Sequence, residues 1–162
     1  MNEKPRTISH VRRTVVHWGR EAGVSRTMSD HLKEVPPAAR LLGREIVSVN
    51  ARPGEVHLRF LARDQFANRH GTIQGGMLAA MLDSATGNAV MASLSSDRTA
   101  VTTRLDTTFI RPAILGPLTA IARLVRQDDR SAEAEAELFD STGQIVARGR
   151  AELRVRQRRS EA

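Results

Sequence analysis

The feature that most constrains this fold is the run from Gly75 to about Leu94, in which most side chains are Met, Leu, Ala or Val. It is broken by Asp83, Ser84, Thr86, Gly87, Asn88 and Ser93. A helix that is apolar almost all round lies within a core, so the run predicts a buried helix on the order of 30 Å long. Two glycines, Gly75 and Gly76, open it, and one acid, Asp83, interrupts it. A buried carboxylate without a partner is costly. Asp83 therefore either lies on an exposed face or serves a site.

The segments on both sides of this helix have the patterns of strands. Before it, residues 44–50 and 55–61 predict two strands joined by a turn at the sequence NARPG. After it, strands are expected over residues 99–112, 118–127, 131–139 and 144–156. The last two alternate Ala with Glu and apolar residues with Arg, so acids on one strand would face arginines on the next. We expect an α+β fold in which one antiparallel sheet, its last four strands a meander, curls around one helix.

Composition excludes several classes of site. The chain has 162 residues, enough for one domain with a sizeable core, and it has no Cys, which excludes disulfides, thiolate metal sites and cysteine nucleophiles. Its five His are scattered, so no metal site is expected. Aromatic residues make up 3% of the chain, too few to predict a stacking surface for nucleic acid. The net charge of +7 is concentrated near both ends, in solvated tails or in segments that attract a phosphate-bearing ligand.

The ends are expected to lie outside the domain. Residues 1–35 predict a basic arm that is either partly ordered or forms short helices near 8–22 and 29–35, the latter stopped by the prolines at 36 and 37. Residues 36–157 would form the domain and residues 158–162 a tail. No apolar run approaches the roughly 20 residues that span a bilayer, and the N-terminus lacks the apolar segment of a secretory signal. We expect a cytoplasmic protein with no membrane or nucleic-acid partner.

One motif connects the loop before the helix with the strand that follows it. The chain carries Asn68, then Gly71, then Gln74-Gly75-Gly76, with Asp83 two turns into the helix. Thr102 stands on the next strand, before the segment FIRP at 109–112. With these residues the chain resembles the hotdog-fold acyl-CoA thioesterases, specifically the phenylacetate-pathway (PaaI-like) branch, over roughly residues 36–156.

The resemblance implies a dimer or tetramer with each site at a subunit interface. Asn68 and Gly75 would come from one subunit, and Asp83 and Thr102 from the other. Asp83 would activate water or attack the thioester directly, and Thr102 would hydrogen-bond the water. Asn68 would orient the substrate carbonyl or support its loop, while Gln74, Gly76 and Arg111 would help to bind the substrate. No cofactor is implied apart from the coenzyme A of the substrate.

The glycines suit such a role on physical grounds. The first backbone N–H groups of a helix have no acceptor within the helix, and its N-terminus is positive. A thioester carbonyl at Gly75 would find a donor for its developing oxyanion. The alternative is that the two glycines only permit a tight turn into the helix. Asp83 lies too far along the helix to reach Gly75 of its own chain.

The chain departs from the family at Gln74, where a His is usual. Gln donates and accepts hydrogen bonds but does not titrate, so activity survives if that His only forms hydrogen bonds. The alternative function is a non-catalytic acyl-CoA-binding sensor. Hotdog hydratases are disfavoured because their catalytic His is replaced by Asn88, and dehydratases because no Glu lies between residues 56 and 132. The prediction is a thioester hydrolase acting on an aromatic or medium-chain acyl-CoA.

Overall fold

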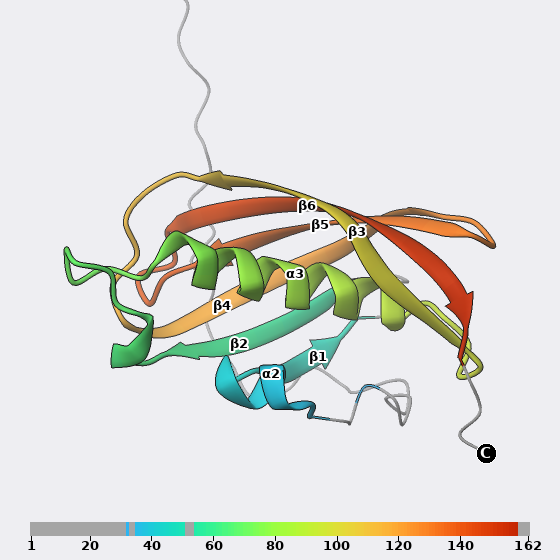
Figure 1. Ribbon diagram of the computed structural model, residues 1–162, viewed down its shortest axis with the longest axis horizontal. Coiled ribbons are helices and arrows are strands. Elements are labelled where there is room, and N and C mark those ends of the chain that lie inside the picture. Colours follow the sequence, from blue (N-terminus) through green and yellow to red (C-terminus); the bar gives the residue numbers. More distant parts are fainter. Residues whose placement is uncertain (1–31, 33–34, 51–53, 159–162) are drawn as a thin grey trace, which may run out of the picture.

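The computed structural model describes residue 32, residues 35–50 and residues 54–158. Figure 1 shows one curved sheet wrapped around one long helix. The elements in chain order are α2 (Pro37–Leu41), β1 (Glu45–Val49), β2 (Val56–Ala62), η1 (Asp64–Phe66), α3 (Gly75–Met91), β3 (Arg98–Phe109), β4 (Gly116–Gln127), β5 (Ser131–Phe139) and β6 (Ile145–Gln157). Every strand pair is antiparallel. The predicted hotdog architecture of six strands around a central helix is confirmed.

The strand order corrects one prediction. The sheet runs β1-β2-β4-β5-β6-β3, so the last four strands do not form a meander. β3 pairs with β6, from Arg98 opposite Gln157 to Phe109 opposite Ala147, and β4 pairs with β2 instead. The segment between β3 and β4 is tied to the loop before α3, because Ile73 N donates to Ala113 O at 2.8 Å. Between β3 and β4 the chain therefore crosses the N-terminal end of α3, and β4 then enters the other half of the sheet, next to β2.

Alanine lines the inner face of the sheet where α3 packs. The buried inner residues of β4, β5 and β6 include Ala120, Ala122, Ala132, Ala134, Ala136, Ala147 and Ala151. Small side chains let a helix approach closely, and at Gly149 an added Cβ would lie 3.1 Å from Cβ of Leu82. The helix therefore rests directly on the middle of the sheet.

Only one face of α3 is buried in this way. Its buried residues are Leu78, Met81, Leu82, Ala85, Thr86, Asn88, Ala89 and Val90. Gly76 and Asp83 are exposed on the other face, seven residues apart and so nearly in line along the helix. The prediction of a core helix is confirmed for the face toward the sheet, and the opposite face is open in the single chain.

The outer face of the sheet carries the predicted rows of charge. Glu133 on β5 accepts hydrogen bonds from Arg150 on β6 and from Arg126 on β4, the latter at 2.7 Å. Glu137 pairs with Arg148 at 2.8 Å. The hydrogen bonds from Arg150 and Arg126 lower the pKa of Glu133 to about 2. The buried Glu133 thus bridges three strands.

The predicted arm is described only in part. Residues 1–31, 33–34 and 159–162 lie outside the described residues, and so do the helix predicted near 8–22 and most of the one predicted over 29–35. The prolines at 36 and 37 begin a helix rather than only ending one, since α2 starts at Pro37. Proline fits the first helical position because the N–H it lacks would have no helical partner there. Among the described residues, no helix is long and apolar enough to cross a bilayer.

Candidate active site

A cavity of about 430 Å³ lies at the N-terminal end of α3. Its walls come from the loop 68–73, the first turn of α3 and the segment 109–113. Three of the predicted site residues line it: Asn68, Gly75 and Arg111. A second hollow of about 380 Å³ lies on the outer face of the sheet among the Arg and Glu side chains. The first cavity is the one that contains predicted site residues.

Asn68 organises the loop that forms one wall of this cavity. Its Nδ2 donates to Thr72 Oγ1 at 2.8 Å, and its Oδ1 accepts from the backbone N–H groups of His70 at 2.8 Å and Thr72 at 3.2 Å. The half-buried amide is therefore engaged on both sides. Of the two roles predicted for Asn68, these contacts provide the support of the loop.

The start of α3 leaves two backbone donors available. The carbonyl of Gln74 accepts from Met77 N at 2.8 Å and Leu78 N at 3.4 Å, and within the described chain the N–H groups of Gly75 and Gly76 have no acceptor. Neither glycine has a positive φ, so backbone conformation does not require glycine at either position. An added Cβ on Gly76 would meet nothing within 4 Å, whereas one on Gly75 would meet Phe109.

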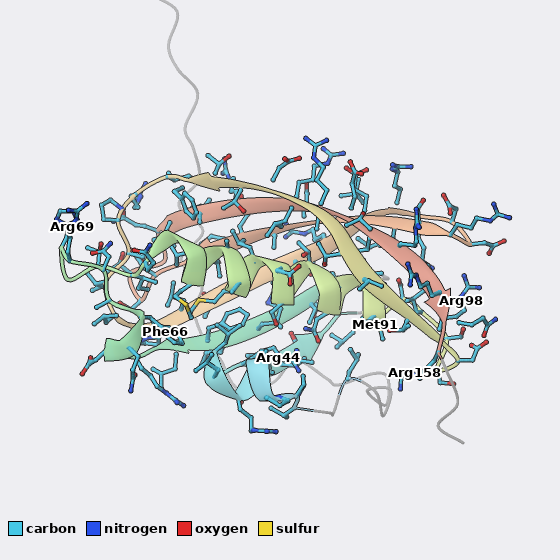
Figure 2. The ribbon with its side chains drawn as sticks, in the orientation of Figure 1. Arg44, Phe66, Arg69, Met91, Arg98 and Arg158 are labelled. Atoms are coloured by element: carbon cyan, nitrogen blue, oxygen red, sulfur yellow. The ribbon has the colours of Figure 1, made fainter. Side chains whose placement is uncertain are left out.

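Gln74 holds the turn into the helix through its backbone. Its N–H donates to Phe66 O at 2.8 Å, and Phe66 lies beneath the first half of α3 in Figure 2. The Gln74 residue is exposed, and its side chain makes no capping hydrogen bond. Among the described residues, the side chain of Gln74 therefore does not cap the helix, at the position where a His is usual.

Asp83 lies away from the cavity. It is eight residues beyond Gly75, which is about 12 Å along the helix axis. Its carboxylate is exposed and makes no hydrogen bond or ion pair with any described residue. In the single chain Asp83 therefore lies on an exposed face, because it is on the side of α3 that points away from the sheet.

Thr102 lies on the helix side of β3, far from the cavity. It pairs with Leu153, is half-buried, and precedes an irregularity in the strand at Thr103, whose hydroxyl donates to Glu152 O at 3.1 Å. Seven residues separate Thr102 from Phe109 at the cavity, roughly 20 Å along a strand. The predicted residues thus form two groups: Asn68, Gly75 and Arg111 at the cavity, and Asp83 and Thr102 away from it.

Arg111 is exposed at the rim of the cavity, and its backbone N–H donates to Val146 O at 3.3 Å. Figure 2 shows Arg69 at the outer tip of the neighbouring loop. Phe109 and Thr72 line or brace the cavity without having been predicted to do so. An aromatic residue two positions before Arg111, in the segment FIRP, was the available indication for Phe109. Among the described residues, no three His, Asp or Glu side chains gather in a way that could hold a metal ion.

Comparison with known proteins identifies the family. The thioesterase superfamily matches residues 70–147, which include most of the cavity loop, α3 and β3. Human acyl-coenzyme A thioesterase 13 is 30% identical over 135 residues, 76% of this chain and 94% of its own. This chain belongs to the thioesterase superfamily. The prediction of a thioester hydrolase is confirmed at that level, and so is the resemblance to hotdog thioesterases of the PaaI-like branch.

Two solved structures are similar to this thioesterase. A phenylacetic acid degradation-related protein from Ralstonia eutropha JMP134 shares 35% identity with a TM-score of 0.74, covering 78% of this chain and 98% of its own. The Escherichia coli PaaI protein from the phenylacetic acid degradation operon shares 23% identity with a TM-score of 0.70, covering 82% of this chain and 92% of its own. The second likeness supports the fold of the thioesterase.

Proposed function

We propose that this thioesterase hydrolyses an aromatic or medium-chain acyl-CoA, in a site that two subunits complete. The observation that carries the proposal is the separation of the two groups of residues. Gly75 offers a free backbone N–H at a cavity, and Asp83 offers a free carboxylate on an open face about 12 Å away. The cavity at Gly75 has no carboxylate from Asp83 of its own chain, and Asp83 has no N–H donor from Gly75 of its own chain, so a second subunit would bring the two groups together.

The chemistry follows from these groups. The thioester carbonyl oxygen would accept a hydrogen bond from the Gly75 amide, which stabilises the negative charge that develops on that oxygen. Asp83 of the other subunit would take a proton from water as the water attacks the carbonyl carbon, or would itself attack that carbon. The C–S bond then breaks, and the sulfur leaves as the thiolate of CoA, which takes its proton from the protonated Asp83 in the first route and from solvent water in the second. In the second route a water molecule then hydrolyses the mixed anhydride between Asp83 and the acyl group, which releases the free acid and restores the Asp83 carboxylate. Thr102 would hold the water, and Arg111, Gln74 and Gly76 would contact the substrate.

The sheet offers an edge for the second subunit. β3 is one of the two end strands of the sheet, and at twelve residues it is longer than β1 at the other end; within the described residues it pairs on one side only, with β6. A long unpaired edge is a template for pairing with another chain. We propose that two copies join along β3, alone or as half of a tetramer. No cofactor beyond the CoA of the substrate, no nucleic acid and no membrane enter the proposal, and the enzyme would work in the cytoplasm.

Release of free thiol from a panel of acyl-CoAs tests the activity. Asp83→Asn should lower kcat by more than about a hundredfold if the carboxylate acts as base or nucleophile, while the exposed Asp129→Asn serves as the matched control and should keep the wild-type rate. If no acyl-CoA is hydrolysed although one binds, the protein is the sensor that forms the alternative. The sensor alternative is supported by Gln74, because Gln cannot transfer a proton as the usual His could.

A complementation experiment tests the shared site. Asp83→Asn and Gly75→Val should each be inactive, yet in a mixed dimer one of the two sites would be intact because its Asp83 and Gly75 come from different chains. Co-expression should therefore restore about half of the wild-type rate per mixed dimer. Mixed dimers that remain inactive would show that both residues act within one chain.

A further inference from the structure

The side chain of Phe109 is exposed where a large aromatic residue would ordinarily be buried. Phe60 and Phe66 are 0% and 3% exposed, whereas Phe109 is 53% exposed. Phe109 ends β3 and lines the cavity beside the first turn of α3. Exposed apolar side chains at a cavity mark a surface that binds something apolar.

The ring of Phe109 lies against Gly75. A Cβ built on Gly75 would stand 3.2 Å from the ring carbon Cζ and 3.4 and 3.5 Å from Cε2 and Cε1. Because the φ of Gly75 is not positive, the ring is the feature within this chain that glycine accommodates. The ring therefore covers the same residue whose amide is proposed to hold the thioester carbonyl.

We propose that Phe109 determines which acyl groups the site accepts, an inference that rests on the proposed function. A carbonyl hydrogen-bonded to the Gly75 amide brings the first atoms of the acyl group within contact distance of the ring. Leu78 and Ile73 complete an apolar wall around that position. A planar aromatic acyl group would stack on the ring or meet it edge to face. Removal of the ring would therefore lower kcat/KM less for a linear acyl chain than for an aromatic one.

The competing role for Phe109 is contact with a second subunit, because it ends the strand whose edge is open. The two roles differ in their dependence on the acyl group. A subunit contact would affect every substrate equally and would change the oligomeric state. A wall of the acyl site would change the ratio between substrates and leave the oligomeric state unchanged.

The test compares phenylacetyl-CoA with octanoyl-CoA, which have acyl groups of equal carbon number. We expect the ratio of kcat/KM for phenylacetyl-CoA over octanoyl-CoA to fall about fivefold to tenfold in Phe109→Ala and less in Phe109→Leu. Ile114→Ala is the matched control, because Ile114 is exposed in the same segment but outside the cavity, and its ratio should equal that of the wild type. An unchanged ratio in Phe109→Ala, or an equal loss for both substrates with dissociation of the oligomer, would overturn the inference.

A second arm tests the contact itself. Gly75→Ala should displace the ring and shift the ratio in the same direction, and it should cause no further shift when added to Phe109→Ala. Additive shifts would show that the ring and Gly75 act independently, against the inference.

Binding separates this inference from the proposed function. If the wild type hydrolyses neither acyl-CoA, the proposed function fails, and calorimetry with the thioethers phenethyl-CoA and octyl-CoA still measures the acyl preference. Phe109→Ala should then weaken phenethyl-CoA binding selectively. Equal weakening of both thioethers, or binding of neither by the wild type, would overturn the role of Phe109.

Discussion

Neither the backbone conformation nor a contact with a described residue requires glycine at position 76. Substitution of Gly76 is therefore a direct test of the site. Its φ is not positive, and an added Cβ would meet nothing within 4 Å. Glycine in a helix is less stable than alanine by roughly 0.5–1 kcal/mol, so Gly76→Ala should leave the fold unchanged or stabilise it by up to that amount. For a chain of this length the gain corresponds to a rise in Tm of about 2–4 °C at most. If a thioester must approach the start of α3, the same methyl group should lower kcat/KM by about tenfold to a hundredfold.

Gly87→Ala is the matched control for the effect on stability, since Gly87 is also in α3 and an added Cβ there also meets nothing within 4 Å. It lies eleven residues further on, about 16 Å along the axis from Gly76. Thermal unfolding would measure stability and thiol release would measure activity in both variants. Wild-type kcat/KM in Gly76→Ala would refute the idea that substrate approaches there. A loss of stability beyond about 1 kcal/mol would refute the open surroundings on which the argument depends.

Three further predictions concern the frame of the site. The pKa of Glu133 is lowered to about 2 from its ordinary value of 4.5, so its stabilising effect should be complete above pH 4.5 and be lost as the pH falls toward 2. The free energy of unfolding in urea should therefore depend less on pH over this range in Glu133→Gln than in the wild type. An equal dependence on pH in both proteins would contradict the pairing. Gly149→Ala would place a methyl group 3.1 Å from Cβ of Leu82 and should lower the free energy of unfolding by about 1–3 kcal/mol, whereas a wild-type urea midpoint would show that α3 is free to shift. Asn68→Ala removes three hydrogen bonds and should lower stability by about 1–3 kcal/mol; Asn68→Asp keeps both accepted bonds and should recover most of the loss in the same assay, and a failure to recover would mean that the bond donated to Thr72 dominates.

Local patterns predicted the elements of this fold well because each pattern reports on burial along its own segment. The helix begins at Gly75 as predicted, and the alternation of Ala with Glu located β5 at Ser131–Phe139. The same patterns say little about which strands become neighbours. Thr and β-branched residues predict β3 as a strand whether it pairs with β4 or with β6. The crossing between β3 and β4 depends on a hydrogen bond from Ile73 to Ala113, a contact between segments forty residues apart that no local period records.

The site residues were predicted through the resemblance, and their places in the fold show why composition alone was insufficient. Asn68 and Gly75 meet at one cavity because the loop before α3 folds back on itself. The role of Phe109 could not be inferred from the strand pattern, since an apolar residue at the end of β3 would fit a buried position equally well. Its exposure and its contact with Gly75 distinguish a wall of the cavity from a core residue.

No contact with a described residue explains why an acid stands at position 83, but the residues around Asp83 indicate a reason. A solvated acid on a surface helix ordinarily stands among other polar residues, yet its neighbours on the open face of α3 include Gly76, Ala79, Ala80 and Gly87. Glycines within a helix lower its stability, and among the described residues no atom lies within 4 Å of a Cβ added at Gly76 or Gly87, so no close contact at these two positions offsets that cost. A face made of small residues around one carboxylate leaves room for another molecule to come close to that carboxylate. The proposed pairing of two subunits would bring both a partner chain and a thioester to this face, which explains the glycines and the acid by one cause.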